Sequence, residues 1–142
     1  LFAQDPIQFY SKDLKEASEA RLRMEAMLRD AIANEELELY LQPIFDLSSG
    51  KVVKAEALLR WFPDHNTVIS PDVFIPVAEQ SGLIYPLGKW VIKQAVEQIT
   101  QWQSKSLMLP VSVNVSAQQL QQTDLVSFVS DLLKNKKDGG KK

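Results

Sequence analysis

In the stretch Lys51–Trp61, the acidic Glu56 and the basic Arg60 stand among the apolar residues that follow Lys54. Its valine and leucine content predicts a strand. Side chains alternate between the two faces of a strand, so Glu56, Leu58 and Arg60 share one face. The other face carries Ala55, Ala57, Leu59 and Trp61. Two explanations are open: Glu56 and Arg60 take part in a same-face or cross-strand ion pair, or Glu56 holds a metal ion while Arg60 holds an anion.

Two amides stand in similar positions on other alternating segments. Gln42 lies on the polar side of Glu38–Ile44, which predicts a half-polar strand. Asn114 lies on the polar side of Leu109–Val115, with valines on the opposite side. An amide oxygen suits a hard metal ion, although an amide in a strand is more often a surface group or a hydrogen-bonded one. From the residues alone, both interpretations of the two amides stay open.

The motif at 56–61, Glu-Ala-Leu-Leu-Arg-Trp, is similar to the signature of EAL domains, the bacterial phosphodiesterases that open cyclic di-GMP. Further blocks resemble the family's first strand, first helix and third strand, in the same order. These blocks are Leu-Tyr-Leu-Gln-Pro-Ile (39–44), Ser-Pro-Asp-Val-Phe-Ile-Pro-Val-Ala-Glu (70–79) with Gly-Leu-Ile (82–84), and Val-Ser-Val-Asn-Val-Ser (111–116) with Gln119 and Leu120. The resemblance runs from Ala31 to about Leu133.

The resemblance implies metal ligands at Glu56 and Asn114 and substrate contacts at Gln42, Leu58 and Arg60. It also implies a two-metal site for Mg²⁺ or Mn²⁺, because two such ions can generate a nucleophile and neutralise the charge that develops on a phosphodiester. In the family, later strands supply further acids, an Asp-Asp pair and a lysine linked to water activation. Those motifs are not in this sequence. The metal site is therefore expected to be incomplete in this chain.

The function implied is hydrolysis of cyclic di-GMP to linear di-GMP by the parent EAL domain, with this chain inactive by itself. The alternative is a degenerate EAL domain that acts as a cyclic di-GMP-binding regulatory module or as a dimerisation module. Retention of Glu56 and Asn114 favours the enzyme, because non-catalytic members commonly lose such ligands. Cyclic di-GMP is the expected partner in either case.

The implied fold is α/β: the amino-terminal half of a (β/α)₈ TIM-like barrel of the EAL type, with three strands and their helices over residues 35–133. A complete barrel takes about 250 residues. The short turn Asp46–Gly50 predicts that the first strand is antiparallel to the second, since a parallel crossover needs about a dozen residues or more. Residues 1–11 are expected to be a linker or the end of a preceding domain, for which the resemblance suggests a GGDEF domain. Residues 134–142 are expected to be a flexible, lysine-rich tail.

Residues 12–34 predict a connector helix, with Ser11 as its N-cap. Near-heptad positions are occupied by Leu14, Ala17, Arg21, Met24, Leu28 and Ala31. Such spacing is typical of a helix that pairs with a second copy, and a solvated helix leading into the domain is the equal alternative.

Further along the chain, Ser70-Pro71-Asp72 predicts the start of a helix that ends at Gly82. Residues 62–69 before it are expected to form a loop. A second helix is predicted over Tyr85–Gln103, and a last one begins at Thr123 or Asp124. In the implied barrel, Asn114 points inward near the carboxyl end of its strand, where barrel active sites lie.

The composition excludes several kinds of binding site and partner for the chain. It has 142 residues, no cysteine and a net charge of −2, so disulfides and thiolate metal sites are excluded and binding to a nucleic-acid polymer is not expected. No apolar run approaches the roughly 20 residues that span a bilayer, so we expect no membrane contact by this chain, although the parent protein could be membrane-anchored. The absence of cysteine suits a reducing compartment, so we expect a cytoplasmic location. A half-barrel leaves strand edges open, which predicts a homo-oligomer.

Overall fold

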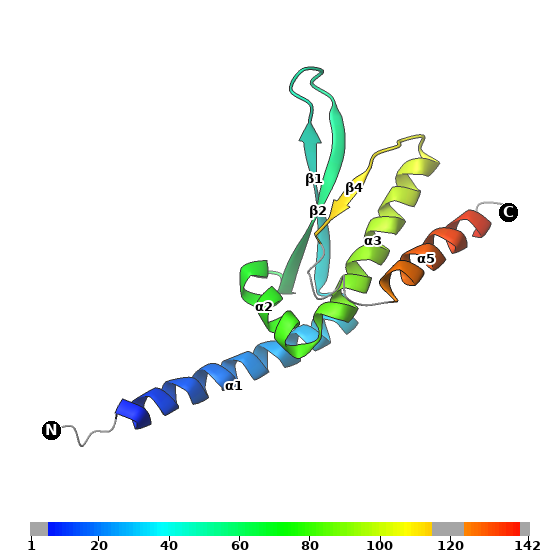
Figure 1. Ribbon diagram of the computed structural model, residues 1–142. Helices are drawn as coiled ribbons and strands as arrows, with labels where there is room; N and C mark the ends of the chain where they lie inside the picture. Colours follow the sequence, from blue (N-terminus) through cyan, green and yellow to red (C-terminus); the bar gives the residue numbers. More distant parts are fainter. Residues whose placement is uncertain (1–5, 115–123, 140–142) are drawn as a thin grey trace.

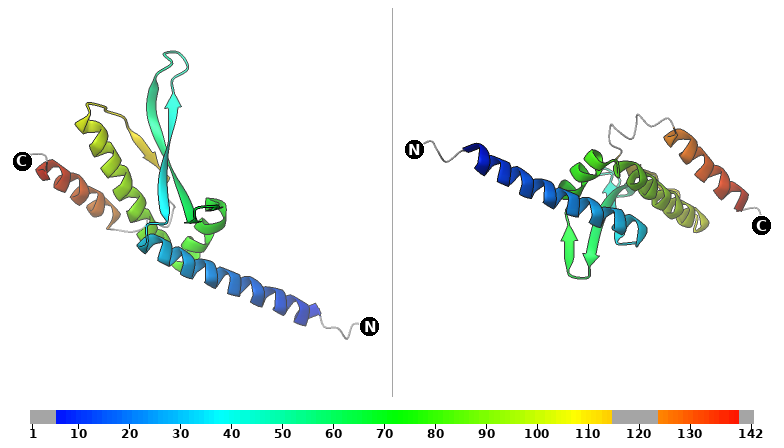
Figure 2. Two further views of the ribbon diagram at one scale, coloured as in Figure 1. Left: turned by 180° about the vertical axis from the view of Figure 1, so that it is seen from behind. Right: turned by 90° about the horizontal axis from the view of Figure 1, so that it is seen from below.

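The computed structural model describes residues 6–114 and 124–139, in which one sheet is bordered by helices (Figure 1). The helices are α1 (Pro6–Ala33), α2 (Pro71–Ser81), α3 (Ile84–Ser104) and α5 (Leu125–Gly139). The strands are β1 (Leu37–Phe45), β2 (Val52–Asp64), β3 (Thr67–Ile69) and β4 (Val111–Val113). α3 lies along the sheet, α5 lies outside α3, and α1 projects away from the rest of the chain (Figures 1 and 2). The expected α/β class is confirmed.

Strand β2 is the centre of the sheet. It pairs antiparallel with β1, from Leu37 opposite Trp61 to Phe45 opposite Val52, which confirms the predicted hairpin. The turn is held by Asp46, whose carboxylate accepts hydrogen bonds from the hydroxyls of Ser48 and Ser49. These bonds, Ser49 first, hold the pKa of the Asp46 carboxyl below its usual value. The turn is therefore specified locally by its polar side chains.

The other edge of β2 is shared by β4 and β3. β4 is parallel to β2, with Ala55 opposite Val111 and Ala57 opposite Val113. β3 is antiparallel and meets β2 further on, where Trp61 lies opposite Ile69. A parallel neighbour requires a crossover, and α2 and α3 provide it. The two helices therefore lie on one face of the sheet and leave the opposite face, which carries Glu56, uncovered.

The core forms between the covered face of the sheet, α1, α2 and α3. Trp61 lies at its centre, fully buried, with its ring edge-on to Phe74 of α2 at a centroid distance of 5.5 Å. Its indole Nε1 donates a hydrogen bond to the Glu36 carboxylate at 3.2 Å. The buried cluster consists of Leu28, Ala31, Leu37, Trp61, Phe74, Ala78, Ile84 and Leu87. Trp61 thus anchors β2 on the face opposite Arg60.

The predicted ends of α2 are confirmed. The Ser70 hydroxyl accepts a hydrogen bond from the backbone N–H of Asp72, and Pro71 occupies the first helical position. The helix ends at Gly82, whose φ of 81° lies in the left-handed region that favours glycine. α3 begins one residue before the predicted start and ends one residue after the predicted end.

Three boundary predictions were wrong. The first helix begins at Pro6, so Ser11 lies within it and is not its N-cap. The predicted loop 62–69 is a second hairpin, because β2 continues to Asp64 and β3 returns after a turn in which Asp64 accepts hydrogen bonds from Asn66 and Thr67. α5 continues to Gly139, so the segment from Lys134 to that residue is helical and not a tail. Thr123 and the block at 115–120 lie outside the described residues.

The second half of the heptad stripe of α1 packs against its own chain. Leu28 and Ala31 are fully buried, and Met24 packs against the core. Arg21 donates a hydrogen bond to the Gln80 side chain of α2 at 3.0 Å. The second half of the proposed dimer seam is therefore occupied within one chain, whereas Leu14 remains about half exposed. Among the described residues, no helix is both long and apolar enough to cross a membrane.

Candidate functional site

Glu56 and Asn114 meet on the uncovered face of the sheet. Glu56 lies in the middle of β2, and Asn114 directly follows β4, the parallel neighbour. The Asn114 Nδ2 donates a hydrogen bond to the Glu56 Oε1 at 3.3 Å. The register brings them together: Ser112 lies opposite Glu56, and Asn114 is the next residue on the same face. Two side chains that are 58 positions apart in sequence thus form one polar pair.

This pair fits part of the ligand shell of a hard divalent cation. Adjacent ligands of an octahedral ion with bonds of about 2.1 Å lie roughly 3 Å apart, close to the separation of these two side chains. An amide turned by half a rotation presents its oxygen in place of its NH₂ group. Carboxylate and amide oxygens are ligands that Mg²⁺ and Mn²⁺ accept. Within 6–114 and 124–139, however, no group of three or more Asp, Glu, His or Cys side chains could enclose a metal ion.

Arg60 does not form the ion pair that the sequence left open. Its Nη1 donates to the Leu59 carbonyl at 3.0 Å, and its guanidinium carbon lies 5.7 Å from the centre of the Tyr40 ring. In the part of the chain that the structure describes, ion pairs join Arg29 to Glu25 and Lys89 to Asp124, and neither Glu56 nor Arg60 takes part in one. The ion-pair explanation is therefore wrong for these residues.

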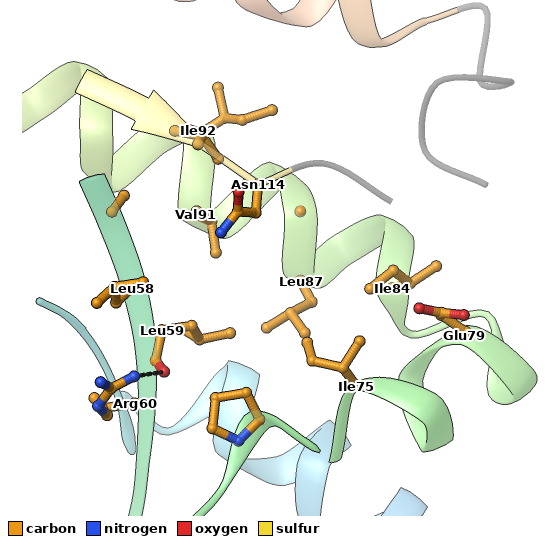
Figure 3. A pocket seen from close by; sticks show the side chains of 14 residues that line it. Leu58, Leu59, Arg60, Ile75, Glu79, Ile84, Leu87, Val91, Ile92 and Asn114 are labelled. Atoms are coloured by element: carbon orange, nitrogen blue, oxygen red, sulfur yellow. Dashed lines mark hydrogen bonds between the residues drawn. The ribbon is translucent and has the colours of Figure 1, made fainter. Parts of the chain in front are cut away.

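Gln42 and Leu58 complete the row of predicted site residues. Gln42 of β1 lies directly opposite Glu56, and Leu58 lies opposite Tyr40. Leu58, Arg60 and Asn114 also line a pocket of about 320 Å³ whose other walls are mainly apolar side chains of α2 and α3 (Figure 3). In that view Leu59 points toward Leu87 and Ile75, while Arg60 lies on the other side of β2. Glu56 and Gln42 do not line the pocket. The predicted residues therefore form a row on the sheet, and only part of this row borders the pocket.

Two aromatic residues at the site were missed by the sequence reasoning. Tyr40 contacts the Arg60 guanidinium, and Phe62 contacts Tyr40 with ring centroids 6.0 Å apart. The alternation of side chains along each strand already indicates these residues, because Tyr40 shares a face with Gln42 and Phe62 shares a face with Arg60. What the pattern lacked was the register between the two strands, without which the two faces cannot be matched.

Comparison with known families identifies the family of the chain. The family model described as "EAL domain" matches residues 25–140, most of the chain. The chain belongs to the EAL domain family. A curated relative, the signaling protein YkoW of Bacillus subtilis, is 37% identical over 126 residues, which are 89% of this chain and 16% of that protein. The cyclic di-GMP phosphodiesterase PdeR of Escherichia coli is 39% identical over 112 residues, 79% of this chain and 17% of that protein.

A solved EAL structure has the same arrangement of elements. The PaMucR phosphodiesterase in complex with c-di-GMP superposes with a TM-score of 0.75 at 33% sequence identity. The match covers 81% of this EAL chain and 47% of the PaMucR chain. This chain therefore spans less than a fifth of the two curated relatives and about half of the solved phosphodiesterase chain.

Proposed function

We propose that this chain is the amino-terminal half of an EAL domain whose complete form hydrolyses cyclic di-GMP to the linear dinucleotide. The contact between Glu56 and Asn114 carries the proposal, because it joins two oxygen-bearing side chains from adjacent strands at a spacing suited to one metal ion. Mg²⁺ or Mn²⁺ ions bound there would supply positive charge that offsets the charge of the phosphodiester and favours ionisation of water. The other ligands would come from outside this chain.

The remaining side chains of the row suit the binding of a cyclic dinucleotide. Arg60 offers a planar fork of N–H donors that matches a phosphate or the edge of a guanine. Gln42 offers both a donor and an acceptor beside Glu56. Leu58 offers an apolar surface between Glu56 and Arg60 for a base. We propose that these residues bind and orient the nucleotide, while Glu56 and Asn114 hold the metal.

The test is calorimetric titration of cyclic di-GMP into the purified chain with Mn²⁺ or Ca²⁺ present. We expect binding that is lost in Glu56→Ala and in Arg60→Ala. Matched controls are Glu16→Ala and Arg23→Ala on the exposed part of α1, which should bind as the unsubstituted chain does. A chain that is folded by circular dichroism but does not bind, or binding that survives both site substitutions, would overturn the proposed site in this chain.

Cleavage is followed separately from binding, by chromatography of the linear dinucleotide. We expect no product from this chain, because it lacks the later strands of the family. The alternative, a binding module that never cleaves, predicts that the complete parent domain also yields no product while it still binds. Product from the complete domain, abolished by Glu56→Ala, would support the enzyme.

We also propose that the chain associates with a second copy. β1 and β4 are each paired on one edge only among the described strands, and the hairpin exposes Tyr40, Phe45 and Val53 to about half of their full extent. Open edges and exposed apolar side chains favour association. Light scattering over a range of concentrations should show a dimer or a larger species, and a monomer at the highest concentration would contradict this.

A further inference from the structure

The Arg60 guanidinium is held by an aromatic ring and not by an acid. Its carbon lies 5.7 Å from the centre of the Tyr40 ring, within the distance at which a cation is attracted to the face of a ring. In the described parts of the chain, its one hydrogen bond is to the Leu59 carbonyl, and no carboxylate pairs with it. Its orientation thus depends on one carbonyl and one ring.

A ring partner leaves the binding capacity of the guanidinium intact. The group has five N–H donors in one plane, and one of them is used by Leu59. A carboxylate would take up further donors at the edge of that plane and cancel the charge, whereas a ring contacts its face. Arg60 therefore keeps its charge and most of its donors for an anion.

The Tyr40 ring is itself restrained. It lies opposite Leu58 in the β1–β2 register and contacts the Phe62 ring at 6.0 Å with the planes 37° apart. Phe62 is partly buried, and it follows the fully buried Trp61 on β2. A chain of contacts thus runs from Phe62 to Tyr40 and from Tyr40 to Arg60. About half of the Tyr40 side chain is exposed, so the contact lies on an accessible surface.

We propose that Tyr40 is a positioning residue, which presents the Arg60 guanidinium to the anionic groups of the bound nucleotide. The inference rests on the proposed role of Arg60 in nucleotide binding. Tyr40 acts through its ring and not through its hydroxyl. Phenylalanine at position 40 should therefore preserve the position of the guanidinium. Leucine, which is apolar but has no aromatic ring, should not.

The first readout is the Arg60 side chain itself, observed by NMR in chain labelled with ¹⁵N-arginine. The chain has four arginines, so the Nε–Hε signal of Arg60 is assigned by its loss in Arg60→Lys. A proton over the face of a ring is shielded, so this signal should lie upfield of the other three. It should keep that position in Tyr40→Phe and join the others in Tyr40→Leu. Phe45→Leu, which removes an exposed ring elsewhere on β1, is the matched control.

The second readout is the affinity for cyclic di-GMP with Mn²⁺ present. Tyr40→Leu should bind about two- to five-fold more weakly, the range that a cation–π contact at an exposed site supports. Tyr40→Phe and Phe45→Leu should bind as the unsubstituted chain does. An Arg60 signal that is unchanged in Tyr40→Leu would overturn the inference, as would loss of that signal's upfield position in Tyr40→Phe. Failure of the unsubstituted chain to bind would overturn the proposed nucleotide site in this chain instead, and the Arg60 signal would then decide the positioning role by itself.

Discussion

Replacing Asn114 by aspartate tests the proposed metal pair most directly. The substitution keeps the shape of the side chain but places a second carboxylate at 3.3 Å from the Glu56 oxygen. Two unit charges at that distance in a water-like dielectric repel by about 1 kcal/mol. The distance is well below the Debye length of about 10 Å, so salt removes little of this repulsion. Without metal, Asn114→Asp should therefore be less stable than the unsubstituted chain by about 1 kcal/mol at pH 7.

A divalent cation should reverse this deficit, because the two negative ligands then share a positive charge. Metal that binds only the folded state raises the free energy of unfolding. The increase grows with the logarithm of the ratio of the metal concentration to the dissociation constant. Asn114→Leu, of similar size and without charge, should show neither the deficit nor the response to metal.

The assay is urea unfolding at pH 7 followed by tryptophan fluorescence, with and without Mn²⁺. We expect the unfolding midpoint of Asn114→Asp to lie below that of the unsubstituted chain without Mn²⁺ and above it with Mn²⁺. If Asn114→Asp were as stable as the unsubstituted chain without metal, the two side chains would not lie as close as the structure has them. If Mn²⁺ stabilised it no more than Asn114→Leu, the pair would not be a metal site.

Three further predictions concern the core, helix α2 and the packing of α5 on α3. Trp61→Phe should lower the free energy of unfolding by about 2 kcal/mol, because it removes one ring from a fully buried site and also the hydrogen bond to Glu36. The measurement is urea unfolding. A loss below about 0.5 kcal/mol, which is the scatter of surface substitutions, would contradict this prediction. Gly82→Ala should cost about 1 kcal/mol in the same assay, because a φ of 81° is strained for a residue with a Cβ atom. The hydrogen bond from Lys89 lowers the pKa of the Asp124 carboxyl, so its contribution to the packing of α5 on α3 is present at neutral pH and is lost as the pH falls through that lowered value. The NMR signals of the Phe128 ring, which lies 5.6 Å from the Lys89 ammonium, should report this change, and Asp124→Asn should abolish the titration.

The local elements were largely determined by the sequence. The turn at Asp46, the N-cap at Ser70 and the left-handed Gly82 depend on hydrogen bonds and dihedral angles within a few residues, so their residue types predict them. The face of β2 that carries Glu56 and Arg60 follows from the strict alternation of a strand. The start of α1 and the hairpin after Trp61 were missed because helix and strand ends depend on weak local preferences that packing overrides.

Tertiary structure decided which side chains meet. The sequence names Glu56, Arg60 and Asn114, but its residues alone left both an ion pair and a metal site open. Only the parallel register of β4 on β2 brings Asn114 to Glu56, and only the antiparallel register of β1 brings Tyr40 to Arg60. A shift of one residue in either pairing would turn the partner to the other face of the sheet. Register depends on contacts between segments that are far apart in the chain, and for that reason alternation along one strand cannot supply it.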